Sequence, residues 1–270
     1  MRTISFYKVV ASGNDFIIIK NKTYSSFELK NIAIKLCDRK YGVGADGLLV
    51  AESSKKVDIK MRIFNSDGTE AEMCGNGMRA FILWAYKKKL IAKRSSIQTK
   101  AGVIDGEVKK NGFVKIKMGA SFEYKPNLRL KIDGELILGD YLDTGVPHFV
   151  VEVKSLSNYD VFNIGSKVRR HSIFQPRGVN VDFMSNKKNY LNVRTYERGV
   201  EGETLACGTG CVASALVYGL KNGHSSKDLT VFPLSGEELN VSYSYKRERF
   251  CDVYLEGKAD LLFESKFKIK

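Results

Sequence analysis

The sequence predicts two similar α+β domains, each of which wraps a sheet around a central helix. Four short glycine-containing motifs occur twice, in the same order and at a spacing of about 130 residues, which indicates a duplicated domain. Segments rich in β-branched residues alternate with helical segments in both halves, which favours a mixed fold. The paired motifs are SGND and TGVP, GVGAD and GVNVD, CGNG and CGTG, and KAG and LSG.

Strands are expected where β-branched residues cluster, or where apolar and polar side chains alternate as in residues 113–117. The predicted strands are residues 17–19, 57–64, 96–99, 113–117 and 149–153.

Each half also carries two predicted helices. Ser25 and Glu28 form a capping box that opens a helix through about residue 39, and Ser157 opens its counterpart, which runs towards residue 170. A second pair of helices, residues 78–89 and 211–221, follows CGNG and CGTG. These two are nearly free of charge for two turns, so we expect both to be buried.

The repeat sets the expected domain boundary near residues 118–126. We expect one domain to cover residues 1–118 and the other residues 119–257, with residues 258–270 returning to the first as a strand.

Composition excludes several classes of protein. The 270 residues include 43% hydrophobic ones and no low-complexity stretch, so the chain is not disordered. We find no apolar run long enough to span a bilayer and no signal peptide, and therefore expect a cytosolic, soluble protein. The net charge of +14 leaves a nucleic-acid-binding protein as an alternative, but the lysines are spread along the whole chain.

The five cysteines are odd in number, and without a secretory signal we expect them to be reduced. Cys37, Cys211 and Cys251 are interpreted as packing residues. Cys211 follows Cys207 by four residues, but no further Cys or His lies nearby, so we predict no zinc site.

The motifs that carry chemistry are Cys74-Gly-Asn-Gly and Cys207-Gly-Thr-Gly, each just before a buried helix. Backbone amides and the helix dipole favour negative charge at such a position, so we expect lowered thiol pKa values and a site for a ligand carboxylate. We expect the two helix ends to face each other across an interdomain cleft. One thiolate then removes a substrate α-proton and the other thiol delivers a proton to the opposite face, without metal or pyridoxal phosphate.

The motifs MCGNGMR, ACGTGC, SGNDF, RIFNSDG and YERGVEGET closely resemble those of the diaminopimelate epimerase family, and the likeness runs from about residue 6 to the end of the chain. The resemblance implies two pseudo-symmetric domains, each a curved, mainly antiparallel sheet around a central helix, and a homodimer. It also implies conversion of LL-diaminopimelate to the meso isomer, for lysine and cell-wall synthesis, with no cofactor, metal, nucleic acid or membrane partner.

The resemblance assigns the site residues. Cys74 and Cys207 match the catalytic pair, and His148 and Glu197 match the residues that assist them. An Arg198 guanidinium suits the distal carboxylate, because its fork forms two parallel bonds. The positions matching α-carboxylate contacts are Gly75, Asn76, Gly208 and Thr209, and those matching other ligand contacts are Asn14, Asn65, Asn180, Glu197 and Arg198.

The chain departs from the family pattern at three positions. Gly47 stands where many members have Gln, Val146 where many have Asn, and Phe263 where a dimer-contact Tyr is common. The first two changes leave a variant amino-acid substrate open. Another cofactor-independent racemase of the same fold, such as a proline racemase, is therefore the alternative, with the phenazine-type isomerases as further relatives by architecture.

Taken without the resemblance, the same residues have plainer interpretations. Asn14 and Asn65 are typical turn residues, and Asn180 is typical of a strand end. His148 is then a hydrogen-bonded core histidine and Arg198 one member of a surface ion pair.

Overall fold

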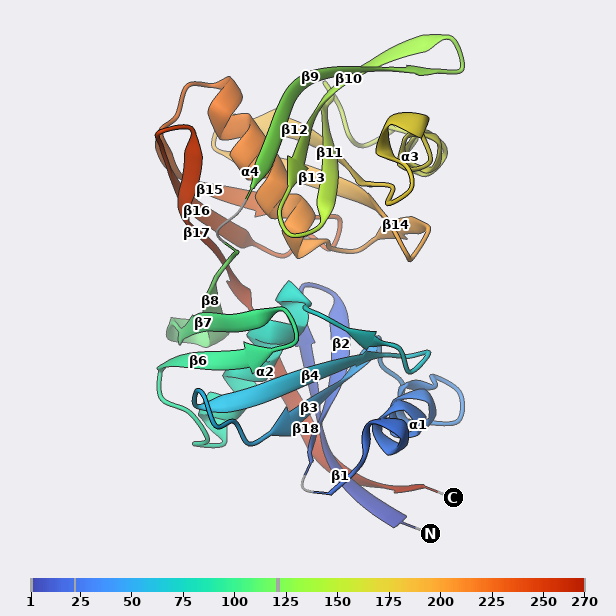
Figure 1. The fold of residues 1–270 in the computed structure, drawn as a ribbon, viewed down its shortest axis with the longest axis vertical. Coiled ribbons are helices and arrows are strands. Elements are labelled where there is room, and N and C mark those ends of the chain that lie inside the picture. Colours follow the sequence, from blue (N-terminus) through green and yellow to red (C-terminus); the bar gives the residue numbers. More distant parts are fainter. Residues whose placement is uncertain (1, 22, 120–121, 270) are drawn as a thin grey trace. The chain divides into compact units, whose positions relative to one another are not determined.

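The computed structural model describes residues 2–21, 23–119 and 122–269, which form two compact units. The first unit consists of the chain up to Ile116 and of the C-terminal segment from Gly257, and the second unit is Lys117–Glu256 (Figure 1). Each unit has its own two α-helices.

The first unit is built on a sheet with helix α1 on one face and helix α2 on the other. Ile17 and Ile19 pack with α1, whereas Leu49 lies against the first turn of α2. Because both faces are covered, β2 and β3 are apolar along most of their length. The elements are β1 (Arg2–Ala11), β2 (Asn14–Lys20), α1 (Ser26–Cys37), β3 (Gly47–Glu52), β4 (Ile59–Asn65), β5 (Glu70–Ala71), α2 (Gly75–Lys87), β6 (Arg94–Thr99), β7 (Gly102–Val108), the 3₁₀ turn η1 (Lys110–Gly112), β8 (Phe113–Lys117) and β18 (Asp260–Ile269).

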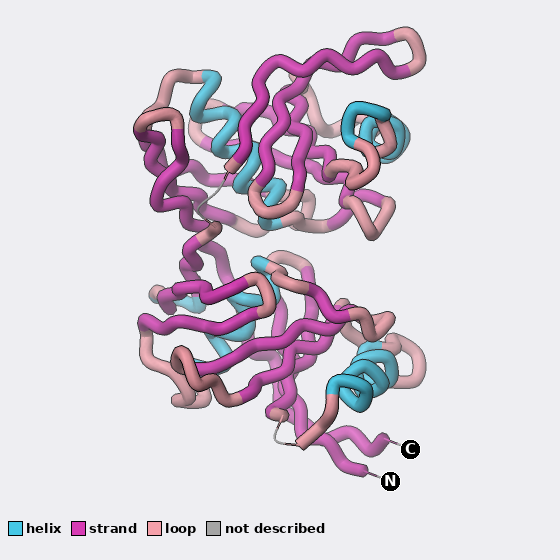
Figure 2. The backbone as a smooth tube through the Cα atoms, viewed as in Figure 1, coloured by secondary structure: helices cyan, strands magenta, loops and turns pink. Residues whose placement is uncertain are grey.

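The second unit repeats this order, with α3 and α4 in the places of α1 and α2 (Figure 2). Val161 and Val168 of α3 pack on Phe149 and Phe183, and α4 contacts β11, β12 and β13. The elements are β9 (Glu123–Ile132), β10 (Glu135–Asp143), β11 (Pro147–Glu152), α3 (Val161–Arg169), η2 (Ser172–Phe174), β12 (Asn180–Lys187), β13 (Tyr190–Glu197), β14 (Gly202–Thr204), α4 (Gly208–Lys221), β15 (Ser226–Phe232), β16 (Leu239–Lys246) and β17 (Arg249–Lys258).

Strand pairing is the same in the two units. β2 pairs in parallel with β3, and β4 with β6, while β11 pairs in parallel with β12, and β13 with β15. The other pairings within each unit, including β1–β18 and its counterpart β10–β9, are antiparallel. The predicted duplication and the mainly antiparallel α+β fold are confirmed.

The helix starts agree with the sequence in one case and differ in three. The capping box of α1 forms as predicted, because Ser25 and Glu28 each accept from the other's backbone N–H. The predicted start at Ser157 is wrong: Leu156 and Tyr159 form a turn, and α3 begins at Val161 with Asp160 as its N-cap. Helices α2 and α4 begin three residues earlier than predicted, so the two motif cysteines are themselves the N-cap residues.

No helix in the described ranges is long and apolar enough to cross a membrane.

Candidate active site

Cys74 occupies the N-cap of α2 in extended backbone conformation and is half-buried. Its sulfur accepts a hydrogen bond from the Gly77 backbone N–H at 3.4 Å. The first turn of any α-helix presents N–H groups that have no acceptor within the helix, and the positive end of the helix dipole lies there. The sulfur therefore sits at a position that favours negative charge.

Two predicted ligand residues meet beside Cys74. Asn76, in the first turn of α2, donates from Nδ2 to Oδ1 of Asn14 at 2.7 Å. Asn14 begins β2 and donates from its own Nδ2 to Asp46 Oδ2 at 2.9 Å. The structure thus brings Asn14 and Asn76 together with Asp46, the last residue of the repeated motif GVGAD.

Asn65 lies at the exposed end of β4, where its side chain donates to Thr69 Oγ1 at 2.9 Å. Register places it at the same sheet edge as Asn14. Gly47 pairs with Asn65 on one side and with Phe16, two residues after Asn14, on the other. A Cβ on Gly47 would lie 2.9 Å from the Phe64 carbonyl oxygen, so a larger residue here requires the strand to shift.

Cys207 is the N-cap of α4 and is buried, with its sulfur 3.4 Å from Thr209 Oγ1. The first turn of α4 packs directly on β12. A Cβ on Gly210 would overlap the carboxylate of Asp182 and lie 3.0 Å from Thr195 Oγ1. Glycine at this position therefore lets the helix end approach the buried carboxylate.

His148 and Asp182 are both fully buried and form a pair, with 2.7 Å between His148 Nδ1 and Asp182 Oδ2. The Thr195 hydroxyl donates to the other carboxylate oxygen at 2.7 Å. A carboxylate oxygen accepts, so Nδ1 of His148 is the donor of this pair and the ring directs Nε2 away from Asp182. Among the described residues, this buried Nε2 has no hydrogen-bond partner.

Asp182 was absent from the predicted site. The signal was the repeated GVxxD motif, which marked Asp46 and Asp182 as equivalent positions. Each carboxylate accepts hydrogen bonds from predicted site residues of its own unit, Asn14 in the first and His148 in the second.

Burial raises the pKa of the Cys207 thiol well above its ordinary value, and the nearby Glu197 and Asp182 carboxylates raise it further. The Thr209 hydroxyl, 3.4 Å from the sulfur, and the nearby Gly210 amide act in the opposite direction but are outweighed. The expectation of a lowered thiol pKa is therefore wrong for Cys207, because desolvation and two carboxylates exceed the effect of the helix end. Burial also raises the pKa of Glu197, despite the opposing effects of Thr204 and His148.

Asn180 and Arg198, two further predicted ligand residues, are hydrogen-bonded to each other. Asn180 accepts at Oδ1 from the Arg198 backbone N–H at 2.8 Å and donates from Nδ2 to the Pro147 carbonyl at 3.2 Å. The Arg198 guanidinium donates to the Arg177 carbonyl at 3.1 Å. Burial lowers the pKa of Arg198, as do the neighbouring guanidinium groups of Arg177 and Arg169. This concentration of positive charge suits an anionic ligand group.

The other cysteines and the acidic side chains were considered as packing residues and as metal ligands. Burial raises the pKa of Cys37 to about 12, which agrees with its interpretation as a packing residue. Within the described ranges, no three His, Cys, Asp or Glu side chains are grouped closely enough to hold a metal ion.

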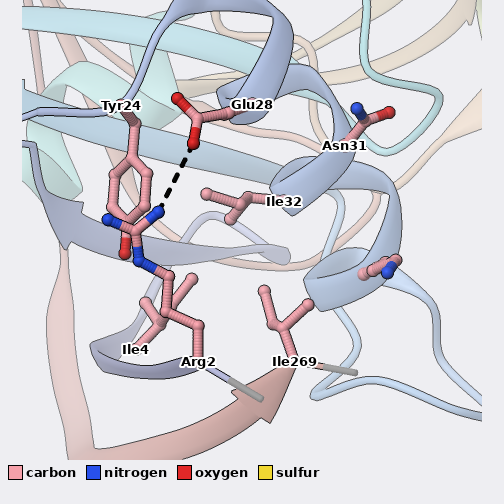
Figure 3. A pocket seen from close by; sticks show the side chains of 8 residues that line it. Arg2, Ile4, Tyr24, Glu28, Asn31, Ile32 and Ile269 are labelled. Carbon is pink, nitrogen blue, oxygen red and sulfur yellow. Dashed lines mark hydrogen bonds and ion pairs between the residues drawn. The ribbon is translucent and has the colours of Figure 1, made fainter.

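A hollow of about 180 Å³ near the chain ends contains none of the predicted site residues (Figure 3). It is mainly apolar, and the Arg2 guanidinium pairs with Glu28 at 3.4 Å and stacks on the Tyr24 ring. Its lining is Arg2, Ile4, Tyr24, Glu28, Asn31, Ile32, Lys35 and Ile269.

Comparison with known proteins gives full-length relatives. The family model of diaminopimelate epimerase matches residues 6–122 and 141–262. A diaminopimelate epimerase from Aquifex aeolicus is 40% identical, over 97% of each chain. One from Methanocella arvoryzae is 38% identical, over 100% of this chain and 98% of its own.

Solved structures with lower identity share the fold. A phenazine biosynthesis protein of the PhzF family from Bacillus anthracis aligns with a TM-score of 0.78 over 100% of both chains, at 21% identity. A probable proline racemase from Agrobacterium radiobacter aligns with a TM-score of 0.76 over 99% of this chain and 93% of its own, at 12% identity.

Proposed function

Because the chain belongs to the diaminopimelate epimerase family, we propose that it inverts one α-carbon of LL-2,6-diaminopimelate to give the meso isomer. The product serves lysine and peptidoglycan precursor synthesis. The observation that carries the proposal is the pair of cysteines at the N-caps of α2 and α4, the equivalent helices of the two units.

The chemistry is a two-base proton exchange. One cysteine thiolate takes the α-proton, so that a C–H bond breaks and an S–H bond forms, and the other thiol gives its proton to the opposite face of the carbon. The charge that develops passes into the α-carboxylate, which the first-turn N–H groups of Gly75, Asn76, Gly208 and Thr209 stabilise. The scheme uses no metal ion or pyridoxal phosphate, because the two sulfurs exchange the protons and the backbone N–H groups stabilise the charge that develops.

The raised pKa of Cys207 suggests its state before turnover. Burial and two carboxylates keep this thiol protonated at neutral pH, which suits a proton donor. His148 and Glu197 lie on the same unit as Cys207 and assist its proton transfer.

The distal carboxylate of the substrate is proposed to bind Arg198, whose guanidinium lies among other cations. Asn180 holds the backbone at Arg198, and Asn14, Asn65 and Glu197 supply the remaining ligand contacts. Gly47 and Val146 offer no side-chain amide, so a variant diacid or amino acid is the alternative substrate.

The deciding measurement is exchange of the substrate α-proton with solvent deuterium, followed by proton NMR. Reduced enzyme without added cofactor should exchange LL-diaminopimelate and form the meso isomer, and should act more weakly on other diacids and simple amino acids. Turnover of the panel without turnover of diaminopimelate would contradict the proposed substrate.

Variants of the two cysteines test the mechanism. Cys74→Ala and Cys207→Ala should each abolish inversion while retaining the fold, whereas Cys251→Ala, at a half-buried cysteine outside the site, should keep full activity. Each Cys→Ser variant should retain partial proton exchange, because only one partner is weakened. Full activity in either of the first two variants would overturn the two-base scheme.

We further propose that the protein is a cytoplasmic homodimer. Each chain consists of two epimerase halves, residues 1–118 with 258–270 and residues 119–257. The grouping of the chain into units that change at Ile116 and Gly257 supports these limits. Phe263, 48% exposed on β18 and edge-on to Phe6, is the proposed dimer contact. Analytical sedimentation tests the dimer: wild type should sediment as a dimer and Phe263→Asp as a monomer. Binding to DNA and RNA, measured against salt concentration, should be weak and independent of salt if the protein does not bind nucleic acid.

A further inference from the structure

Arg79 is a completely buried cation in the second turn of α2. Its Nη2 donates to Asn76 Oδ1 at 2.5 Å and to Ser12 Oγ at 2.8 Å, and its Nη1 donates to the Lys258 carbonyl at 3.3 Å. A buried charge is costly unless several hydrogen bonds compensate it, and the guanidinium fork reaches these three acceptors from one position.

The bond to Asn76 is the first link of a polar chain. Asn76 Nδ2 donates to Asn14 Oδ1 at 2.7 Å, and Asn14 Nδ2 donates to Asp46 Oδ2 at 2.9 Å. One end of this chain is a guanidinium, which can only donate, and the other is a carboxylate, which can only accept. Both amides are thereby fixed in one orientation, because a flip of either would set two donors or two acceptors against each other.

The fold itself does not require this cation. The cysteine-capped helix α4 has the same place in the second unit, and Val212 stands there at the position of Arg79, five residues after the cysteine. Val212 is buried within that unit's core. A helix of this kind therefore packs without an arginine, so Arg79 must be explained by what it contacts.

We propose that Arg79 is a positioning residue that orients the side-chain amides of Asn76 and Asn14 for a carboxylate-bearing ligand. This inference rests on the proposed function, in which both asparagines contact the substrate. With Asn14 Oδ1 turned towards Asn76, its nitrogen faces Asp46 and the solvent side, and an amide nitrogen carries a second N–H that can donate to an anion. A flipped amide would present its oxygen and repel the carboxylate.

The test is a double-mutant cycle on KM with Arg79→Met and Asn14→Ala. Asn76 links the two side chains. If Arg79 acts on KM through the orientation of the Asn14 amide, the two substitutions remove the same contribution, and their effects on KM are not multiplicative. We expect each variant to raise KM about tenfold or more, the double variant to raise it far less than the product, and Arg79→Lys to recover part of the loss. A larger effect on KM than on kcat distinguishes positioning from general loss of structure.

Ser12→Gly is the matched control. It removes another acceptor of the same guanidinium, leaves the bond to Asn76, and suits the backbone, because Ser12 has φ of 51°. We expect its KM to stay within about twofold of wild type. If Arg79→Met raises KM no more than Ser12→Gly, or if the effects in the cycle multiply, the inference is wrong.

The result is separable from the proposed function. If wild-type enzyme exchanges the α-proton of no diacid or amino acid, the proposed function fails, and the inference is then decided by the same cycle measured on urea midpoints. Coupled midpoint shifts for Arg79 and Asn14 support the oriented chain, and additive shifts overturn it. Arg79→Lys replaces Arg79→Met in either cycle if the methionine variant does not fold.

Discussion

Substitution of Gly210 by alanine should damage the enzyme, whereas the equivalent change at Gly77 should not. A Cβ on Gly210 would overlap Asp182 Oδ1 and lie 3.1 Å from Asp182 Cγ and 3.0 Å from Thr195 Oγ1. Favourable contacts between such atoms need about 3.5 Å or more, so the first turn of α4 must move by roughly 0.5–1.3 Å. At Gly77 the nearest atom would be the flexible end of Leu49, at 3.3 Å.

The magnitudes follow from two opposing effects. Alanine gains about 0.5–1 kcal/mol over glycine in a helix, and overpacking costs about 1–3 kcal/mol. Gly210→Ala should therefore lose stability by about 1–2 kcal/mol, and Gly77→Ala should be neutral or slightly more stable. Displacement of Cys207 by up to about 1 Å should lower the rate of α-proton exchange roughly 10- to 100-fold, against less than about threefold for Gly77→Ala.

Thermal unfolding and the deuterium-exchange rate, measured on both variants, provide the check. Equal behaviour of the two alanine variants would refute the reasoning, because the close approach of α4 to Asp182 is the only difference it uses. If Gly210→Ala exchanged the α-proton at the wild-type rate, the activity of Cys207 would not depend on the position of this turn.

Three further predictions concern charge and helix capping. Burial and the Glu197 and Asp182 carboxylates raise the pKa of Cys207, so Glu197→Gln should lower it and let iodoacetamide label Cys207 at lower pH, as followed by peptide mass mapping; an unchanged profile contradicts this. Burial would raise the pKa of Asp15, but hydrogen bonds and charges from Arg39 and Lys8 hold this pKa below its ordinary 3.8. The ionised Asp15 therefore stabilises the fold above that pH, and the stabilisation is lost as the pH falls through the lowered pKa. Asp15→Asn should flatten the acid side of the melting-temperature profile, and a profile as steep as wild type argues against the assignment. Ser25→Ala should cost about 1 kcal/mol in urea unfolding and Ser157→Ala less than about 0.5 kcal/mol, because only Ser25 caps a helix; equal losses would contradict the observed start of α3.

The repeat made the fold predictable. Motifs that recur at one spacing fixed the order of elements in both units, and the uncharged segments after the cysteines marked the buried helices α2 and α4. Boundaries were less certain where competing local bonds exist. Ser157 carries the pattern of a cap, but a turn between Leu156 and Tyr159 delays α3 until Asp160.

The site was predictable as a set of residues but not as an electrostatic environment. The pairing of Asn14 with Asn76 and the burial of His148 depend on which strands are neighbours and in what register. Local sequence does not determine either. The raised pKa of Cys207 arises from burial, and further from Glu197 and Asp182, which lie on β13 and β12 and reach the helix end only in the folded unit. Helix position alone predicted the opposite direction.

The pairing of β1 with β18 has a consequence for how the protein is made. Arg2 lies opposite Ile269, so the first unit needs a strand that leaves the ribosome after the whole second unit. Until then one edge of β1 has no antiparallel neighbour, and an open edge can recruit other chains. Nascent chains stalled before residue 260 should therefore hold a folded second unit beside an unfinished first one that depends on chaperones.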